Sequence, residues 1–390
     1  MIVTHLTLSD FRNYRSLDID LAPGSNLFVG SNGQGKTNLV ESLGYLSTLG
    51  SHRVSSDQAM IRQGQDSAII RARLAFGERE ILAEVQLNRA SANRAQVNRV
   101  AIKTRELPRY FSSVIFAPED LALVRGEPSG RRRFLDELLV LRAPRMSGVL
   151  ADYERVLKQR NTLLKSARAS GVRESQLSTL DIWDDRLVSL GTELIVARSA
   201  LVAELAPEVA SAYEAVAGQD HSAALSTYLS ILASSAGSDD DEQDAAATAT
   251  GAIAQDFVAD AFRAALARLR RTELDRGLTL VGPHRDDLVL SLNGMPARGY
   301  ASHGESWSFA LALKLASAVV LRRESSVGDP VLVLDDVFAE LDESRRGRLA
   351  AAVGDFEQVL ITAAVFDDVP EELAAHVVRI RAGEVIEDAG

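Results

Sequence analysis

The beginning of the chain alternates apolar and polar residues, as a half-buried β-strand does. Ile2, Leu6 and Leu8 fall on one side of such a strand, because successive side chains point to opposite faces. Other alternating or short apolar runs predict strands at residues 1–9, 26–29, 67–75, 80–88 and 112–116. The first 125 residues or so are therefore expected to form mostly β-structure.

The middle of the chain, residues 131–274, changes to a helical period. Six apolar residues recur there at alternating steps of four and three: Trp183, Leu187, Leu190, Leu194, Ala197 and Leu201. Such steps fit about three heptads of a coiled-coil seam, or one face of an amphipathic helix packed in a bundle. The spacing leaves both interpretations open, and either one makes this region an α-helical arm. Within it, residues 234–251 contain an acidic block without apolar periodicity, which predicts a flexible insert.

After about residue 275 the pattern returns to strands mixed with helix. Strands are expected at residues 278–280, 289–292, 331–334 and 359–362, with a closing hairpin at 377–386. The simplest architecture is an α/β domain whose two halves, residues 1–130 and 275–390, are split by a helical arm domain, residues 131–274.

Composition and charge narrow the possible functions. The 390 residues include no cysteine, which excludes disulfides, thiolate metal sites and cysteine nucleophiles. The net charge is -11, so a nucleic-acid site would need a local basic patch. One segment offers such a patch, with a single acidic residue among six basic ones: Arg89, Arg94, Arg99, Lys103, Arg105 and Arg109. The arm adds Arg155, Lys158, Arg160, Lys165 and Arg168. An ordinary solvated face remains the alternative for both sets.

Membrane and export signals are not evident. The amino terminus does not resemble a signal peptide, and the longest helical apolar stretch, residues 309–321, is shorter than the roughly 20 residues that span a bilayer. We therefore expect a cytoplasmic protein without a membrane segment.

A phosphate-binding loop is the strongest local signal. Residues 30–37 satisfy the pattern GxxxxGK[ST] at every fixed position, with an apolar run before them and a helical pattern after them. Glycine-rich backbone at a helix N-terminus can surround a phosphate with N–H groups. The residues expected to bind ATP are Gly30, Ser31, Asn32, Gly33, Gln34, Gly35, Lys36 and Thr37. Lys36 would reach the β- and γ-phosphates, and Thr37 would bind Mg²⁺.

Two carboxylates end an apolar strand far downstream, as in a Walker B motif. Asp335 follows the run 331–334 and is expected to hold Mg²⁺. Asp336 is expected to orient or deprotonate the attacking water. The long separation between the two motifs indicates a large insertion between the two halves of one nucleotide site.

A third element begins a helix about thirty residues before Asp335. Ser302 and Gly304 lie in the sequence Ser-His-Gly-Glu, which has the position of the signature of ABC-type ATPases. A serine hydroxyl and a glycine N–H at a helix N-terminus can bind a γ-phosphate that a second protomer presents. Residues 340–342 look like the accompanying D-loop.

In this order, the elements resemble the ATPase heads of ABC and SMC proteins. Six stretches resemble, more narrowly, the RecF recombination-repair family of bacteria: residues 10–14, 116–121, 131–136, 152–161, 282–287 and 334–342. The resemblance runs from about residue 2 to residue 365. It implies an α/β fold, an ABC/SMC-like P-loop ATPase head split in sequence, with an inserted α-helical arm domain. Two features depart from the usual pattern: His303 and Glu305 stand where glutamine is common, and the acidic insert near residues 239–244 is extra. In addition, no histidine follows residues 359–362, so Thr362 or a neighbour would have to replace the γ-phosphate-sensing histidine.

The resemblance also implies a function. It is that of a Mg²⁺-dependent ATPase that dimerises on ATP, binds gapped, single-stranded or junction DNA, and helps load RecA with RecR and RecO. Its catalytic residues would be Lys36, Asp336, Ser302 and Gly304. Because Asp336 is one methylene shorter than the glutamate common at this position, hydrolysis is expected to be slow. The alternative is another SMC/ABC-type ATPase, either a chromosome-organising protein or a transporter subunit.

Overall fold

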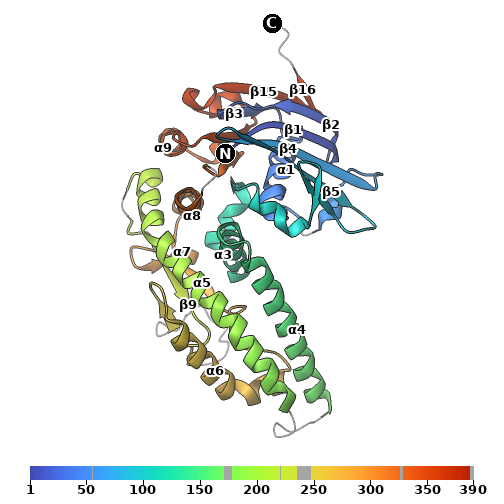
Figure 1. Ribbon diagram of the computed structural model, residues 1–390. Coiled ribbons are helices and arrows are strands. Elements are labelled where there is room, and N and C mark those ends of the chain that lie inside the picture. The colour runs from blue at the N-terminus through green and yellow to red at the C-terminus, as the bar shows by residue number, and fades with distance from the viewer. Residues whose placement is uncertain (55, 171–177, 220, 235–246, 326–327, 387–390) are drawn as a thin grey trace. The chain divides into compact units, whose positions relative to one another are not determined.

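The computed structural model describes residues 1–54, 56–170, 178–219, 221–234, 247–325 and 328–386 (Figure 1). These residues form two compact units. The first contains residues 1–124, 208–221 and 301–390, and the second contains residues 125–207 and 222–300. The first unit is therefore assembled from both ends of the chain.

An antiparallel sheet forms one part of the first unit. Its strand order is β2 (Tyr14–Asp20), β1 (Ile2–Phe11), β4 (Ser67–Phe76), β5 (Arg79–Asn88), β6 (Arg94–Val97) and β7 (Val100–Ile102). Alternate residues of β4 and β5 are buried, because one face of the sheet covers the core. The strands predicted at 1–9, 67–75 and 80–88 are confirmed, while β2, β6 and β7 were not predicted.

A second, mostly parallel sheet carries the motifs. Its order is β16 (Glu384–Ile386), β15 (His376–Arg381), β3 (Gly24–Val29), β14 (Gln358–Ala363), β13 (Val331–Asp335) and β8 (Ser113–Phe116). Only the β15–β16 pair is antiparallel. Every residue of β13 and β14 is buried, as expected of parallel strands covered on both faces. The carboxyl ends of β3, β13 and β14 consequently meet at one edge.

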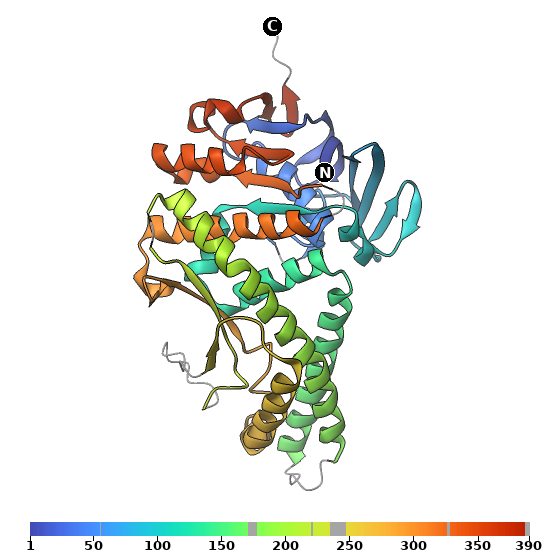
Figure 2. The same ribbon diagram turned by 60° about the vertical axis from the view of Figure 1, so that its left-hand side comes forward.

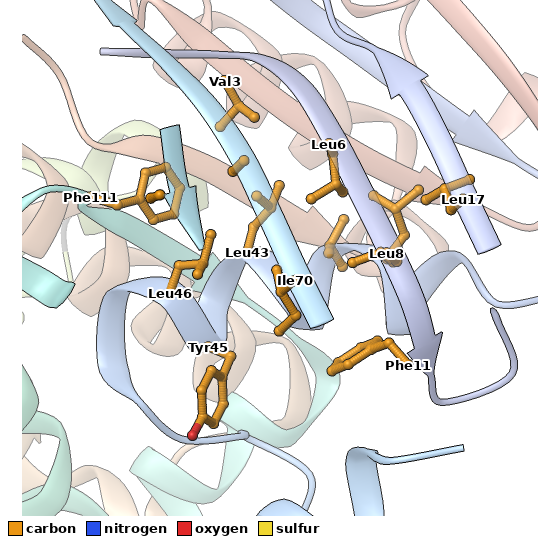
Figure 3. Packing of buried hydrophobic residues seen from close by; sticks show 14 of the residues in the cluster. Val3, Leu6, Leu8, Phe11, Leu17, Leu43, Tyr45, Leu46, Ile70 and Phe111 are labelled. Carbon is orange, nitrogen blue, oxygen red and sulfur yellow. The ribbon is translucent and has the colours of Figure 1, made fainter. Parts of the chain in front are cut away.

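Helices of the first unit cover these sheets. They are α1 (Lys36–Thr48), α8 (His303–Glu324) and α9 (Glu343–Val353), and the short α2 (Leu121–Arg125) ends where the second unit begins. Leu43 and Leu46 of α1 belong to one buried cluster with Leu6 of β1 and Ile70 of β4 (Figure 3). Figure 2 shows α8 alongside β8, and the two elements are in contact.

The apolar helix α8 is a core helix of this unit. It is the one helix of the described residues that is long and apolar enough to cross a membrane, but 78% of its most apolar window is buried inside the fold. The helix is apolar around most of its circumference because it packs against other parts of the fold on nearly all sides.

Helices dominate the second unit. They are α3 (Pro128–Arg142), α4 (Met146–Ser170), α5 (Ser178–Ala217), α6 (Gln255–Arg276) and α7 (Ala297–Tyr300), and α5 continues past Pro207 into the first unit. Figure 1 shows α4, α5 and α6 side by side. A Cβ on Gly191 of α5 would lie 2.6 Å from Phe262 of α6 and 3.1 Å from Tyr153 of α4, so the three helices pack closely at this glycine.

The buried face of α5 is wider than a coiled-coil seam. Leu187, Leu194 and Leu201 are buried as expected, but each has a buried neighbour, Val188, Ile195 and Val202. Trp183, Leu190 and Ala197 are only partly buried. This broad stripe is that of a helix in a bundle, so the bundle interpretation fits and the seam does not.

A small sheet completes the second unit, in the order β10 (Thr248–Ala249), β9 (Ala224–Tyr228), β11 (Asp287–Leu292) and β12 (Met295–Pro296). Residues 275–300, which the sequence assigned to the first domain, lie in this unit, because β11 pairs with β9. The predicted insert at 234–251 lies partly outside the described residues, and its end forms β10.

One predicted strand, residues 278–280, is wrong. The backbone N–H groups of Thr279 and Leu280 donate to side chains, Asn161 Oδ1 and Glu273 Oε1, at 2.8 Å each. Their hydrogen bonds are therefore satisfied without a neighbouring strand.

Candidate nucleotide-binding site

The phosphate loop connects the end of β3 to the beginning of α1, as the sequence predicted. Gly33 and Gly35 have φ of 81° and 115°, the left-handed region in which a side chain is strained. Gly30 has a different constraint, since a Cβ there would overlap the carbonyl oxygen of Ile380. Ser31, Asn32 and Gly33 are exposed, so the tip of the loop is open to a ligand.

Lys36 lies inside this loop. Its side chain is buried, with 3% of its surface exposed, and Nζ donates to the carbonyl oxygens of Gly30 at 2.7 Å and Ser31 at 3.4 Å. These carbonyls hold the ammonium group across the concave side of the loop. Within the described part of the chain, this buried cation therefore bonds to neutral carbonyls and to no carboxylate, which suits an anionic ligand.

Residues outside the motif hold the loop in shape. The carbonyl oxygen of Gln34 accepts from Asn13 Nδ2 at 3.1 Å and from the backbone N–H of Gly383 at 3.0 Å. Gln34 Oε1 accepts from the N–H of Ala382 at 2.6 Å, and the Tyr14 hydroxyl donates to Gly35 O at 3.0 Å. The turn between β15 and β16 thus supports the loop, which no local motif could have predicted.

Thr37 and Asp335 meet although they are 298 residues apart. Thr37 Oγ1 donates to Asp335 Oδ1 at 3.0 Å. Asp335 is 2% exposed, and burial raises the pKa of its carboxyl to about 6; the charge of Asp336 also raises it, while hydrogen bonds from Thr362 and Thr37 act in the opposite direction. The predicted pair of Mg²⁺ ligands is therefore brought together.

The donor set fits a magnesium nucleotide. Thr37 donates its only hydroxyl hydrogen to Asp335, which leaves the lone pairs of Oγ1 for a cation. Hydroxyl and carboxylate oxygens are the ligands that Mg²⁺ prefers. A bound cation would favour the ionised form of Asp335 and so lower the pKa that burial raises.

Asp336, the first residue after β13, has a left-handed backbone with φ of 50°, and its N–H donates to Thr362 Oγ1 at 2.9 Å.

The signature residues form a helix cap. Ser302 precedes α8 and makes a capping box, in which Ser302 N–H donates to Glu305 Oε2 at 2.7 Å and Glu305 N–H donates to Ser302 Oγ at 3.3 Å. Glu305, the departure from the usual pattern, therefore has a local structural role. These bonds lower the pKa of Glu305.

Gly304 lies against the D-loop side of the unit. A Cβ on Gly304 would come within 2.8 Å of the Arg345 guanidinium. Arg345 is held by Asp342, whose Oδ1 accepts from the Arg345 N–H at 2.9 Å and whose Oδ2 accepts from NH1 at 3.1 Å. Among the residues that the structure describes, the hydrogen bonds of Ser302 run within its own helix, to Glu305 and Ser306.

The predicted basic patch divides into two groups. Arg89 is used by the fold, because its guanidinium donates to the carbonyl oxygens of Gln65, Ile61 and Arg62 at 2.6–3.3 Å. The remaining five side chains are exposed, and we call them the basic surface: Arg94, Arg99, Lys103, Arg105 and Arg109.

In the arm, the set of basic residues is also mixed. Arg160 is fully buried between Glu273 and Asp184, at 2.6 Å from each, and is structural. Arg155 pairs with Asp152, while Lys158 and Lys165 are exposed. The sequence of the arm therefore contains more basic residues than the number of basic side chains that are free of acidic partners and exposed for contact with DNA.

Comparison with known proteins identifies the family. Residues 2–383 match the family described as RecF/RecN/SMC N terminal domain. A protein of Clavibacter sepedonicus named DNA replication and repair protein RecF is 68% identical over 388 residues, which cover 99% of this chain and 95% of the relative. The chain belongs to the RecF family. A protein of the same name from Leifsonia xyli subsp. xyli is 67% identical and matched over its full length, and one from Frankia alni is 52% identical over 99% of both chains.

Solved structures agree with this assignment. A recombination mediator protein RecF bound to ATP, described as part of the RecFOR pathway, is similar with a TM-score of 0.85 and 27% identity over 99% of this chain and 97% of its own. The Smc head domain of Pyrococcus furiosus shares the fold with a TM-score of 0.51 and 13% identity over 98% and 95%. The chain thus has the ABC/SMC-like ATPase head fold that its motifs predicted.

Proposed function

We propose that this RecF-family chain is a Mg²⁺-dependent ATPase that couples nucleotide binding to DNA binding in recombinational repair. The observation that carries the proposal is the hydrogen bond between Thr37 and Asp335, which joins a complete phosphate loop to the Walker B strand. The ATP complex of the similar RecF structure supports the nucleotide assignment.

The residues of the site divide the chemistry among them. Backbone N–H groups of residues 33–37 and the ammonium of Lys36 would bind the phosphates, and Thr37 and Asp335 would hold the metal. Bound Mg²⁺ would offset the charge of the phosphate oxygens. Asp336 would orient and deprotonate the attacking water.

Hydrolysis is expected to be slow. Asp336 is one methylene shorter than the glutamate common at this position in ABC-type ATPases, so its carboxylate reaches about 1 Å less far. Misplacement on that scale can reduce a rate by about a hundredfold. A slow ATPase suits a timer for a DNA-bound state better than a motor.

We further propose that ATP joins two copies of the chain. Ser302 and Gly304 are exposed or half-buried at the start of α8, where a helix N-terminus can bind an anion. Because their contacts lie within their own helix and beside Arg345, they are available to complete the site of a second copy. The expected assembly is a closed two-fold homodimer with two composite sites.

DNA is the proposed macromolecular ligand. The five exposed cations of the basic surface lie on β6, on the turn after it, and on the 3₁₀ helix (Thr104–Arg109) with its N-cap Lys103. Phosphate contacts require such cations. By family resemblance the DNA is gapped, single-stranded or junction DNA, RecR and RecO are the partners in loading RecA, and the compartment is the cytoplasm.

Measurement of ATPase activity and sedimentation, with and without gapped duplex DNA, tests the proposal. Lys36→Met should remove ATP-dependent dimerisation and ATP-stimulated DNA binding together, because the phosphate charge is no longer neutralised. Lys103→Met, which changes an exposed lysine of the basic surface, should keep ATP binding and weaken only DNA binding. Tight ATP-driven dimers of the Lys36→Met variant would contradict the proposal.

A further inference from the structure

Thr362 contacts both Walker B residues, the carboxylate of Asp335 and the backbone of Asp336. In the parallel ladder it is the direct neighbour of Asp335, on β14 beside β13. Its Oγ1 donates to Asp335 Oδ1 at 2.7 Å and accepts from the backbone N–H of Asp336 at 2.9 Å. One hydroxyl therefore contacts both residues of the pair.

The hydroxyl is fully engaged by these contacts. Thr362 is 0% exposed, and its single hydroxyl hydrogen is directed to Asp335. It is thus not available to detect a γ-phosphate, which was one role open to it from the sequence. Its position gives it a different role within the same site.

Each of the two hydrogen bonds of the Thr362 hydroxyl fixes the position of one Walker B residue. The bond to Asp335 and the bond from Thr37 end on the same oxygen, Oδ1, and together they fix the orientation of the carboxylate. The bond from Asp336 N–H holds a residue with a left-handed backbone, φ 50°, which is strained for a residue other than glycine. A side chain without the hydroxyl would remove one of the two hydrogen bonds that orient Asp335 Oδ1, and would also remove this acceptor of the Asp336 N–H.

We propose that Thr362 is the positioning residue of the Walker B pair, and that its hydroxyl sets the Mg²⁺ affinity of the nucleotide complex by orienting Asp335 and anchoring the backbone of Asp336. The proposal rests on the Mg²⁺-dependent ATP binding proposed above. Groups that orient metal ligands by hydrogen bonding typically change metal affinity or activity by about 10–100-fold when they are removed.

The test compares variants with and without the hydroxyl. Thr362→Val keeps the shape of the side chain, Thr362→Ser keeps the hydroxyl, and Thr362→Ala removes it without adding atoms should the valine variant fail to fold. Thr192→Val is the matched control, because Thr192 is also buried but its hydroxyl has no hydrogen-bond partner among the described residues.

ATP binding by the full chain is measured calorimetrically at increasing Mg²⁺ concentrations and again in EDTA. We expect Thr362→Val and Thr362→Ala to need at least about tenfold more Mg²⁺ for half-maximal enhancement of binding, with unchanged ATP affinity in EDTA. Thr362→Ser should stay close to the original chain, and Thr192→Val should equal it.

Other outcomes overturn the idea. A normal Mg²⁺ requirement in Thr362→Val or Thr362→Ala would show that the hydroxyl is not needed, and a serine variant as impaired as the valine variant would assign the effect to the lost methyl group. If ATP binding by the original chain is itself independent of Mg²⁺, the proposed function fails instead, and the two failures are thus distinguished.

Discussion

At the scale of single residues, the glycines of the phosphate loop are required for two different reasons. Gly33 has an unusual backbone conformation, with open space around its Cα, whereas Gly30 has an ordinary one but lies against the backbone of Ile380. A side chain at Gly33 therefore meets only conformational strain, while one at Gly30 must displace a strand.

We predict that Gly33→Ala retains the fold and loses about 1–2 kcal/mol of stability, the usual cost of a left-handed residue. Gly30→Ala should separate the loop from β15 and abolish ATP binding. Thermal unfolding and ATP titration of the two variants check this. Equal effects of the two substitutions on ATP binding would show that the contact with Ile380 is unimportant.

The residues of the site were predictable to the extent that they belong to local motifs. Lys36, Thr37 and Asp335 follow from short patterns because neighbouring residues define their geometry. The role of Gln34 depends on a turn 348 residues further along the chain, and those of Asn13 and Thr362 depend on contacts with residues 21 and 27 positions away on other elements. No short motif contains these pairings, so only the structure reveals the contacts.

At the scale of elements, the basic surface lies on β6, on the turn after it and on the 3₁₀ helix with its N-cap, at the edge of the antiparallel sheet. Its five cations differ from Arg89, which is close in sequence but bonds to backbone carbonyls. Because Arg89 serves the fold and the five cations of the basic surface are exposed, substitutions within this one segment can test DNA binding and provide their own control.

Replacing Arg94, Arg99 and Arg105 together by glutamine should reduce the slope of log K for DNA against log salt by about two to three units, since each phosphate contact contributes about 0.9. Arg89→Gln is the control, and it should lower thermal stability with little change in the slope. Fluorescence anisotropy at several salt concentrations measures both. An unchanged slope in the triple variant would make this surface an ordinary solvated face.

A second element-scale prediction concerns His284 in the second unit. Burial lowers the pKa of His284 to about 3, and the ring lies between the Tyr153 hydroxyl, 2.7 Å from Nδ1, and Thr279 O, 3.3 Å from Nε2. The unfolded chain binds a proton near the ordinary histidine pKa of 6.5, whereas the folded chain does so only near 3. Burial of the neutral ring therefore contributes its full free energy of unfolding above pH 6.5, and this contribution is lost as the pH falls from 6.5 toward 3.

Relative to His284→Gln, the original chain should lose about 1.4 kcal/mol of unfolding free energy for each pH unit below 6.5. Urea unfolding at pH 7 and pH 5 measures the difference. His303→Gln, at an exposed position, should leave the pH dependence unchanged. Parallel curves for the original chain and His284→Gln would mean that the folded protein protonates this ring.

Most elements were predictable from the sequence, and the failures have identifiable causes. The parallel strands were found because burial on both faces gives continuous apolar runs. Residues 278–280 have the same apolar character, but Asn161 and Glu273 satisfy their backbone. In α5, the true burial extends to Val188, Ile195 and Val202, because the helix contacts two neighbours where a seam assumes one.

At the scale of the whole molecule, the proposed dimer predicts complementation between defective copies. Ser302→Arg should leave ATP binding by the monomer intact but prevent dimers and hydrolysis, because the added side chain blocks the partner's phosphate. Lys36→Met is defective in the phosphate loop. A mixture of the two can form one composite site with neither substitution.

We expect this mixture to form heterodimers and to regain a measurable part of the ATPase activity, whereas each variant alone stays inactive. Sedimentation and ATPase assays of equimolar mixtures test it, with circular dichroism to confirm folding. ATP hydrolysis by isolated Ser302→Arg monomers would exclude a role for Ser302 in the site of a second copy.

The position of β3 in its sheet also has a consequence for synthesis of the protein on the ribosome. Both neighbours of β3, the strands β14 and β15, come from the last tenth of the chain. At translation rates of about 5–20 residues per second, β3 emerges between roughly 15 and 65 seconds before β14. During that interval an apolar strand and a phosphate loop exist without the strands that complete them. Nascent chains should therefore need protection by a chaperone, and should acquire nucleotide binding only after β14 and β15 have been synthesised.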